Sequence, residues 1–187
     1  MPISILIWTL IIVIILIAFI FFYYFNRFAI LSNRIDNSLS QIDVQLKRRA
    51  DLIPNLIETV KGYAKHEKTI IASVTNARKV LVGATDLPSR VKANDKLEGA
   101  LGRLFALAEN YPDLKANTNF IELQKELTTT EDRVAYARQS YNDSILDYNN
   151  LCTTFPGTFF AGMYGRQKKE YLQITSKERE VVKVDFE

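Results

Sequence analysis

The 187-residue sequence has little of the chemistry that catalytic sites use, with one histidine, His66, and one cysteine, Cys152. A lone cysteine cannot form an intrachain disulfide, which agrees with a reducing compartment. His66-Glu67 matches the start of a zinc-protease motif, but that motif needs a second histidine four residues later, where this chain has Ile70. A zinc site of that type is therefore excluded, and a serine or threonine nucleophile would have no histidine base other than His66.

Glycine and proline are also scarce, with seven and five residues respectively. The segments between them are rich in Leu, Ala, Lys, Glu and Arg, which favour helix. Two-residue alternation is missing outside residues 181–186, so no strand is expected to lead into a glycine-rich phosphate loop. Carboxylates such as Glu131 and Asp132 are common, but nothing marks a matched acid and base. We expect an all-α protein that is not an enzyme and uses no cofactor and no metal.

Charge of one sign does not dominate the chain, which has 24 basic and 21 acidic residues and a formal net charge of +3. That balance indicates a mixed, solvated surface and does not fit the strongly basic face of a nucleic-acid binder. All of these charges lie after residue 25. The roughly 160 residues that carry them have the length of one domain.

Charge is absent altogether from the run Ile3 to Phe25, ISILIWTLIIVIILIAFIFFYYF. A hydrocarbon core about 30 Å thick needs roughly 20 apolar residues as a helix, so this run can span it. The residues from Phe21 to Phe25 are all aromatic and suit the headgroup level. No Lys or Arg precedes the run, which is too long for a signal-peptide core and lacks a small-residue cleavage site. We expect a retained transmembrane anchor over residues 1–25.

Basic side chains lie on one side of this run only. Arg27 and Arg34 follow it, whereas no Lys or Arg precedes it. Because Lys and Arg remain on the cytoplasmic side, we predict a single-pass protein with its N-terminus outside and residues 26–187 in the cytoplasm.

From Asn26 onward, apolar residues recur every three or four positions, the pattern of an amphipathic helix with coiled-coil-like phasing. The first apolar stripe, which Arg49 interrupts, consists of Ile35, Leu39, Ile42, Leu46, Ile53, Leu56 and Val60. Pro54 within this pattern predicts a kink or a break, and Gly62 is a second weak point. We prefer a helix end near Gly62, with Pro54 as the alternative boundary.

Further helical segments follow, including a long last one. A turn signal at Asp86–Ser89 separates two of them. The second stops before Pro112, because the residue before a proline is pushed out of helical geometry. The last helix starts near Asn117 and ends before Phe155. Its apolar stripe is Phe120, Leu123, Leu127, Val134, Ala137, Tyr141, Ile145 and Tyr148. Short connections predict an antiparallel, up-down four-helix bundle over residues 26–154, with long first and last helices.

Several stretches carry a specific signature. They are Gln41–Glu67 (QIDVQLKRRADLIPNLIETVKGYAKHE), Ala100–Leu127 (ALGRLFALAENYPDLKANTNFIELQKEL), Thr130–Asp143 (TEDRVAYARQSYND), Phe155–Gly157 (FPG) and Ala161–Gly165 (AGMYG). Together they resemble the LemA family of bacterial membrane proteins over nearly the whole chain after the anchor. Two departures concern local packing: the family usually shows Ala-Trp in place of Ser38-Leu39, and Asn-Leu in place of Gly157-Thr158.

The resemblance implies an N-terminal anchor in the bacterial cytoplasmic membrane, a cytoplasmic antiparallel helical bundle and no established enzymatic activity. Some members of the family are encoded beside an HtpX-type membrane metalloprotease, and one branch takes part in forming magnetosome membranes. The partners that this suggests are the lipid bilayer and other membrane proteins, an HtpX-type protease among them. A homo-oligomer is a further option.

Lys47, Arg48 and Arg49 form the densest basic cluster. Along a continuous helix, Lys47 would lie about 33 Å beyond Phe25, whereas screening acts over about 8 Å, so attraction to lipid is not expected. One interpretation is a solvated helix face that is paired with acidic neighbours. Those neighbours would be Asp43, Asp51 and Glu58. The other interpretation makes Lys47, Arg48 and Arg49 candidates for docking a partner.

The closing segment, residues 155–171, combines aromatic and basic side chains but is too short to span a membrane. Such a mixture suits the headgroup layer of an anionic leaflet. The candidates for a membrane interface are Phe155, Phe159, Phe160, Tyr164, Arg166, Lys168 and Lys169. The alternative is a cap that buries Phe159, Phe160 and Met163 on the end of the bundle. The remaining residues, 172–187, are expected to form a flexible tail.

These features predict a non-catalytic, membrane-anchored helical scaffold or adaptor. The alternative is a membrane-organising protein that contacts lipid through its closing segment. A discrete protein partner would favour the first, and lipid-dependent self-assembly without a partner would favour the second.

Overall fold

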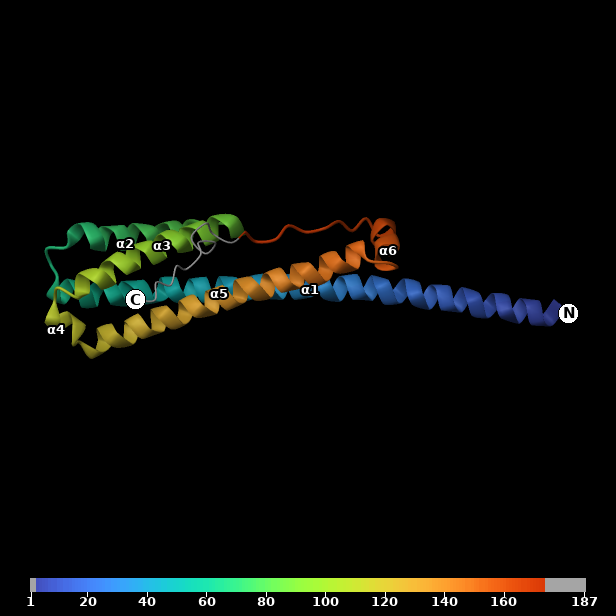
Figure 1. The fold of residues 1–187 in the computed structure, drawn as a ribbon, viewed down its shortest axis with the longest axis horizontal. Coiled ribbons are helices and arrows are strands. Elements are labelled where there is room, and N and C mark those ends of the chain that lie inside the picture. Colours follow the sequence, from blue (N-terminus) through green and yellow to red (C-terminus); the bar gives the residue numbers. More distant parts are fainter. Residues whose placement is uncertain (1–2, 174–187) are drawn as a thin grey trace, which may run out of the picture. The chain divides into compact units, whose positions relative to one another are not determined.

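The computed structural model describes residues 3–173, and every regular element in that range is helical, which confirms the all-α prediction. The elements are α1 (Ile3–Tyr63), α2 (Lys68–Gly83), α3 (Leu87–Ala108), α4 (Pro112–Lys115), α5 (Thr118–Thr153) and α6 (Gly157–Met163) (Figure 1). The flexible tail expected at residues 172–187 lies outside the described residues from position 174 onward.

The first helix, α1, is 61 residues long and contains both the apolar run and the first amphipathic stripe without a break. It ends next to Gly62, as preferred from the sequence, and Pro54 lies inside it. A proline in a helix removes the hydrogen bond to the carbonyl four residues earlier, which here is that of Ala50. The Nε of Arg78 on α2 donates to this carbonyl oxygen at 2.8 Å. A side chain from another helix thus replaces the hydrogen bond that Pro54 removes, so Pro54 does not end the helix.

Side chains at the loops fix where two of the helices begin. The Asp86 carboxylate accepts a hydrogen bond from the Ser89 backbone N–H at 2.9 Å and so caps the start of α3. The Asn117 side-chain oxygen accepts one from the Phe120 N–H at 3.0 Å and caps α5 in the same way. The turn signal at Asp86–Ser89 is therefore a helix N-cap, and the predicted helix start near Asn117 is one as well.

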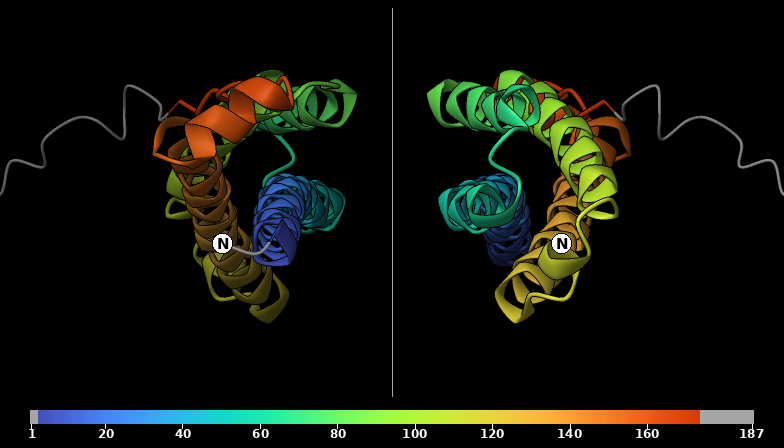
Figure 2. Two further views of the ribbon diagram at one scale, coloured as in Figure 1. Left: turned by 90° about the vertical axis from the view of Figure 1, so that its right-hand side faces the viewer. Right: turned by 90° about the vertical axis from the view of Figure 1, so that its left-hand side faces the viewer.

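The described chain forms two compact units, and α1 and α5 each contribute to both. One unit covers Leu39–Gln139. In it α2 and α3 pack side by side in opposite directions, and the short α4 lies in the connection from α3 to α5 (Figures 1 and 2). The predicted stripes supply much of its buried apolar set: Ile42, Leu46, Ile53, Leu56, Val60, Phe120, Leu127, Val134 and Ala137.

The other unit joins the chain up to Ser38 with the chain from Ser140 onward. Its core consists of Phe28, Leu31, Ile35, Ile145, Tyr148, Cys152, Phe160 and Ala161. Ser38 and Ser144 are buried in this unit, with their hydroxyl oxygens 3.1 Å apart. The apolar run before this core is exposed in the isolated chain, and it is long and apolar enough to cross a membrane.

Candidate functional site

The short helix α6 packs against α1 where the apolar run ends. The ring of Phe160 stacks on Tyr24 with centroids 4.6 Å apart and planes 7° apart. The Tyr164 hydroxyl donates to the Phe21 carbonyl oxygen at 2.7 Å, and its ring meets Phe25 edge-on at 5.6 Å. These contacts fix α6 beside the aromatic end of the run, because stacked and edge-on aromatic pairs hold both position and orientation.

The opposite side of α6 is apolar and exposed. Phe155, just before the helix, is 88% exposed, and Phe159 and Met163 are 62% and 53% exposed. We call these three residues the aromatic face. The alternative of a cap that buries all three of Phe159, Phe160 and Met163 is therefore wrong for Phe159 and Met163, whereas Phe160 is buried and stacks on Tyr24 of α1.

Gly157, the first residue of α6, lies close to the backbone of Leu151 near the end of α5. A Cβ atom at this position would overlap the Leu151 carbonyl oxygen and touch the Leu151 side chain. A glycine is therefore required at position 157 for steric reasons.

The basic residues of the closing segment divide into two groups. Arg166 and Lys168 are exposed, and the charges of both act on Cys152, so they lie near the end of α5. Lys169 is partly buried, with its Nζ 5.4 Å from the centroid of the Tyr148 ring. The first two residues therefore remain available to an external anion, whereas Lys169 is held against the protein by a cation–π contact.

Cys152 is buried in the same core and is not exposed as a nucleophile. Burial raises the pKa of its thiol, and only partial compensation comes from Tyr148 and from the nearby basic charges. A thiol with a raised pKa carries little thiolate at neutral pH, so Cys152 acts as a small core residue.

The basic cluster Lys47-Arg48-Arg49 does not form one surface. Arg49 is 1% exposed, Arg48 forms an ion pair with Glu126 of α5 at 2.8 Å, and Lys47 is exposed. The expected pairing with Asp43, Asp51 and Glu58 is wrong for the two arginines. Arg49 is buried and Arg48 is paired with α5, although its side chain remains 47% exposed, so Lys47 and Arg48 are the exposed docking candidates.

Arg49 lies at the centre of a buried polar cluster. Its Nη1 donates to the Asn94 side-chain oxygen at 2.9 Å, and its Nη2 lies 3.4 Å from Glu131. Burial lowers the pKa of Arg49, although the charge of Glu131 opposes this shift. Burial also raises the pKa of Glu131, a change that Arg49 opposes and Glu98 reinforces. Within the described residues, the Nε of Arg49 and the Oε1 of Gln45 are buried without a hydrogen-bond partner.

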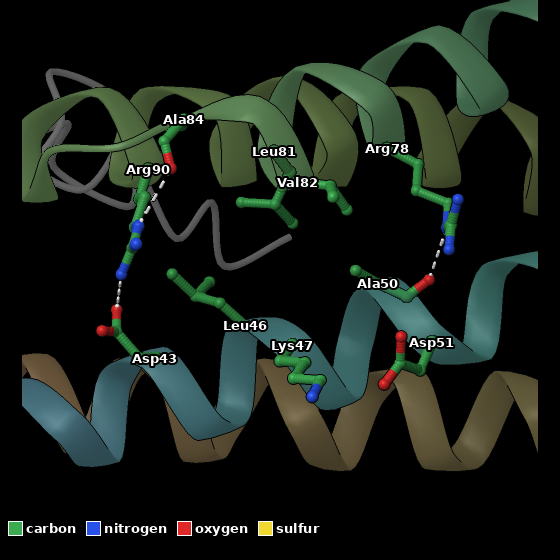
Figure 3. Close-up of a pocket in the computed structure, with 10 residues that line it drawn as sticks. All are labelled: Asp43, Leu46, Lys47, Ala50, Asp51, Arg78, Leu81, Val82, Ala84 and Arg90. Atoms are coloured by element: carbon green, nitrogen blue, oxygen red, sulfur yellow. Dashed lines mark hydrogen bonds and ion pairs between the residues drawn. The ribbon is translucent and has the colours of Figure 1, made fainter.

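A groove of about 370 Å³ lies between α1 and the α2–α3 pair (Figure 3). Leu46, Leu81 and Val82 give it an apolar lining, and charged side chains surround them. Arg90 donates to Asp43 and to the Ala84 carbonyl oxygen, and so closes one end. The remaining lining residues are Lys47, Ala50, Asp51 and Arg78. In the described part of the chain, no group of three His, Cys, Asp or Glu side chains is placed to hold a metal ion.

Sequence reasoning missed Arg78 and Arg90 as organising residues, and it missed Asn142 and Asn149 on α5. One signal was available for Arg78, because a proline inside a helical pattern leaves a free carbonyl that needs an external donor. The asparagines are seven residues apart, and the spacing alone does not reveal what they bind.

The fold defines a helical protein whose N-terminal helix is long and apolar enough to cross a membrane. The LemA family model matches residues 38–186, and the chain belongs to the LemA family. Neither the family name nor the names of the relatives below denote an enzymatic activity.

Among the curated relatives are magnetosome proteins and a protein named LemA. Magnetosome protein MamQ 2 of Paramagnetospirillum magneticum is 25% identical over 175 residues, covering 80% of this chain and 64% of its own length. Magnetosome protein MamQ of Magnetospirillum gryphiswaldense is 26% identical, with 79% and 64% covered. Protein LemA of Metamycoplasma hominis is 27% identical over 124 residues, covering 66% of this chain and 57% of its own length. The chain thus spans less than two thirds of the length of these relatives.

Proposed function

We propose that this chain is a non-catalytic scaffold of the bacterial cytoplasmic membrane, anchored by residues 1–25. Its N-terminus would lie outside, and residues 26–154 would form an antiparallel four-helix bundle in the cytoplasm. Support comes from the exposed apolar run, from Arg27 and Arg34 just after it, and from the side-chain contacts of α1 with α2, α3 and α5. Basic residues beside one end of a span place that end in the cytoplasm.

We further propose that α6 forms a second contact with the bilayer. The single observation that carries this proposal is the packing of Phe160 and Tyr164 on α1 at Phe21–Phe28, where the apolar run ends. If the run spans the hydrocarbon core, the aromatic face of α6 lies at the headgroup level of the same leaflet. Exposed aromatic side chains are favourable there and costly in water.

Basic side chains favour an anionic leaflet for this contact. Arg27, Arg166 and Lys168 are exposed in the unit that contains α6. Each Lys or Arg held near an anionic surface contributes about 1 kcal/mol of attraction. The closing segment therefore combines apolar insertion with charge attraction, the two terms on which interfacial binding depends.

Fluorescence quenching by brominated lipid tests this contact. The sole tryptophan is Trp8, so Trp8→Phe removes the background, and Phe159→Trp then reports on the aromatic face. We expect strong quenching of Phe159→Trp in vesicles with brominated acyl chains. The control is Tyr136→Trp, since Tyr136 is exposed in the other unit. Equal, weak quenching of both variants would overturn the lipid contact.

Docking of a membrane protein is the second candidate function. Exposed Lys47 lines the groove between α1 and the α2–α3 pair, and this groove offers apolar contacts within a charged rim. The partner would be an HtpX-type membrane protease or a second copy of the chain. The alternative function is membrane organisation, which the relatives named magnetosome proteins suggest. Cross-linking from position 47 in native membranes decides between them. A discrete protein adduct supports docking, and lipid-dependent self-assembly without an adduct supports membrane organisation.

A further inference from the structure

The segment after α6 is held along α5 by two asparagine side chains. We call residues 166–172 the strap, which leaves α6 and runs back in the opposite direction to α5 (Figure 1). Asn149 accepts from the Lys169 N–H at 2.8 Å and donates to the Lys169 carbonyl at 2.9 Å. Asn142 accepts from the Leu172 N–H at 2.9 Å and donates to the Leu172 carbonyl at 3.0 Å. Each amide thus satisfies both backbone groups of one strap residue, as a neighbouring β-strand would.

The distance between Asn142 and Asn149 along α5 equals the distance between Lys169 and Leu172 along the strap. Seven residues of an α-helix rise about 10.5 Å, and they complete nearly two turns, so Asn142 and Asn149 share one face of α5. Three residues of extended chain cover about 10 Å, the separation of Lys169 and Leu172. The two rises agree to within about 1 Å, so an extended chain fits both asparagines without distortion.

The strap is bound through its backbone, with selective contacts at two side chains. Lys169 lies over the Tyr148 ring, and Leu172 is buried. Glu170 and Tyr171, between them, are exposed. Backbone hydrogen bonds supply affinity for any extended peptide, and contacts at particular side chains supply specificity. A peptide that binds here therefore needs an extended backbone, a basic residue opposite Asn149 and an apolar residue three positions later.

We propose that this face of α5 is a binding site for extended peptides of the pattern Lys-x-x-Leu, and that the strap occupies it in cis. The strap follows α6 through Gly165, whose φ of 63° completes a helix-ending turn in which the Arg166 N–H donates to the Ala161 carbonyl. Occupancy of the site therefore also fixes the C-terminal end of α6.

Emptying the site in the full-length protein makes the proposal measurable. Lys169→Pro with Leu172→Pro removes both N–H donors of the strap and leaves α5 unchanged. The probe is a fluorescein-labelled peptide of residues 165–173, and the readout is fluorescence anisotropy. We expect saturable binding to this variant, and at least about tenfold weaker binding to wild type, because a tethered strap competes at millimolar effective concentration. No binding to the emptied variant would overturn the proposal.

Two matched controls separate backbone recognition from general adhesion. Adding Asn142→Ala and Asn149→Ala to the emptied variant should abolish binding, whereas retained binding would contradict the proposal. A peptide N-methylated at the positions of Lys169 and Leu172 should fail to bind, and one N-methylated at Glu170 and Tyr171 should bind. Equal behaviour of the two peptides would also contradict it.

Proteolysis of the strap gives an independent measurement that does not need the proline variant. Trypsin cleaves after Arg166, Lys168 and Lys169, all within the strap. Asn149→Asp keeps an acceptor but loses the donor, and it should speed cleavage there at least about tenfold, with unchanged helical circular dichroism. Addition of the unlabelled peptide to wild type should speed the same cleavage. Unchanged rates in both experiments would show that the strap is not a displaceable ligand.

Discussion

A single proline makes a distant arginine necessary. Pro54 deprives the Ala50 carbonyl of its helical donor, and Arg78 supplies a new one from α2. A partly buried carbonyl without a donor costs about 1–3 kcal/mol. The stabilisation that Arg78 provides between α2 and α1 therefore depends on Pro54, and substitutions at the two positions should not have additive effects.

A double-mutant cycle tests this dependence. We predict that Arg78→Met lowers the free energy of unfolding by about 1–3 kcal/mol, because methionine keeps the apolar stem and loses the donor. In a Pro54→Ala background the same change should cost less, since the residue 54 N–H then reaches the Ala50 carbonyl. Urea unfolding of the four proteins in detergent gives the coupling energy, and equal costs in both backgrounds would contradict the mechanism.

The buried Arg49 carries a desolvation cost that its partners only partly offset. We predict that Arg49→Met destabilises the chain by about 1–3 kcal/mol, because buried Asn94 loses its donor. Arg49→Met with Asn94→Leu should recover most of that loss, since replacing a whole buried polar group by apolar side chains is often neutral. Thermal unfolding of the single and double variants measures this, and additive losses would rule it out.

Glu131 makes stability depend on pH. Its folded pKa is raised above the ordinary value of 4.5, chiefly by burial, so the folded chain binds this proton more tightly than the unfolded chain. The resulting stabilisation is fully present below about pH 4.5 and is lost as pH rises through the folded pKa. Because its side chain is 43% exposed, the effect is reduced by solvent. The Tm difference between wild type and Glu131→Gln should fall across this window; a flat difference would contradict the assignment.

At the scale of elements, α6 depends on one close approach. Its first residue, Gly157, leaves no room for a Cβ beside Leu151, whereas a Cβ at Gly162 in the same helix would meet no atom within 4 Å. The two glycines therefore form a matched pair, in which only the first has a steric reason to be glycine.

We predict that Gly157→Ala lowers stability by about 1–3 kcal/mol through overpacking. Gly162→Ala should be neutral or stabilising by up to about 1 kcal/mol, because alanine favours helix. Thermal unfolding followed by circular dichroism compares them. Similar effects of both substitutions would mean that the approach to Leu151 does not position α6.

The helices could be predicted from the sequence because their apolar stripes repeat at a helical period. Ile42, Leu56 and Ile145 are all buried as expected. Contacts between distant residues could not be predicted, since Arg49 is 45 residues from Asn94 and 82 from Glu131. The strap was missed for another reason: the asparagines bind backbone atoms, which carry no sequence pattern. Phe155 and Phe159 of the aromatic face were identified as candidates, whereas Met163 was expected only in the buried cap, because which side chains are exposed depends on the packing of α6.

For the whole molecule, the testable question is which side of the membrane holds the helices. Cys152 is buried, so Cys152→Ser with Tyr136→Cys provides one exposed thiol. We predict that a membrane-impermeant maleimide labels this variant in opened cells and not in intact cells, as expected for cytoplasmic residues 26–187. Trp8→Cys near the N-terminus is the reverse control, with accessibility limited by lipid. Labelling of Tyr136→Cys in intact cells would refute the orientation.

The continuity of α1 has a mechanical consequence. No joint separates Phe25 from Asn26, so the apolar run and residues 26–38 of the same compact unit form one continuous helical segment. A membrane span responds to a thinner bilayer by tilting. If the apolar run spans a bilayer, such a tilt would turn residues 26–38 with it, because α1 continues through them without a linker.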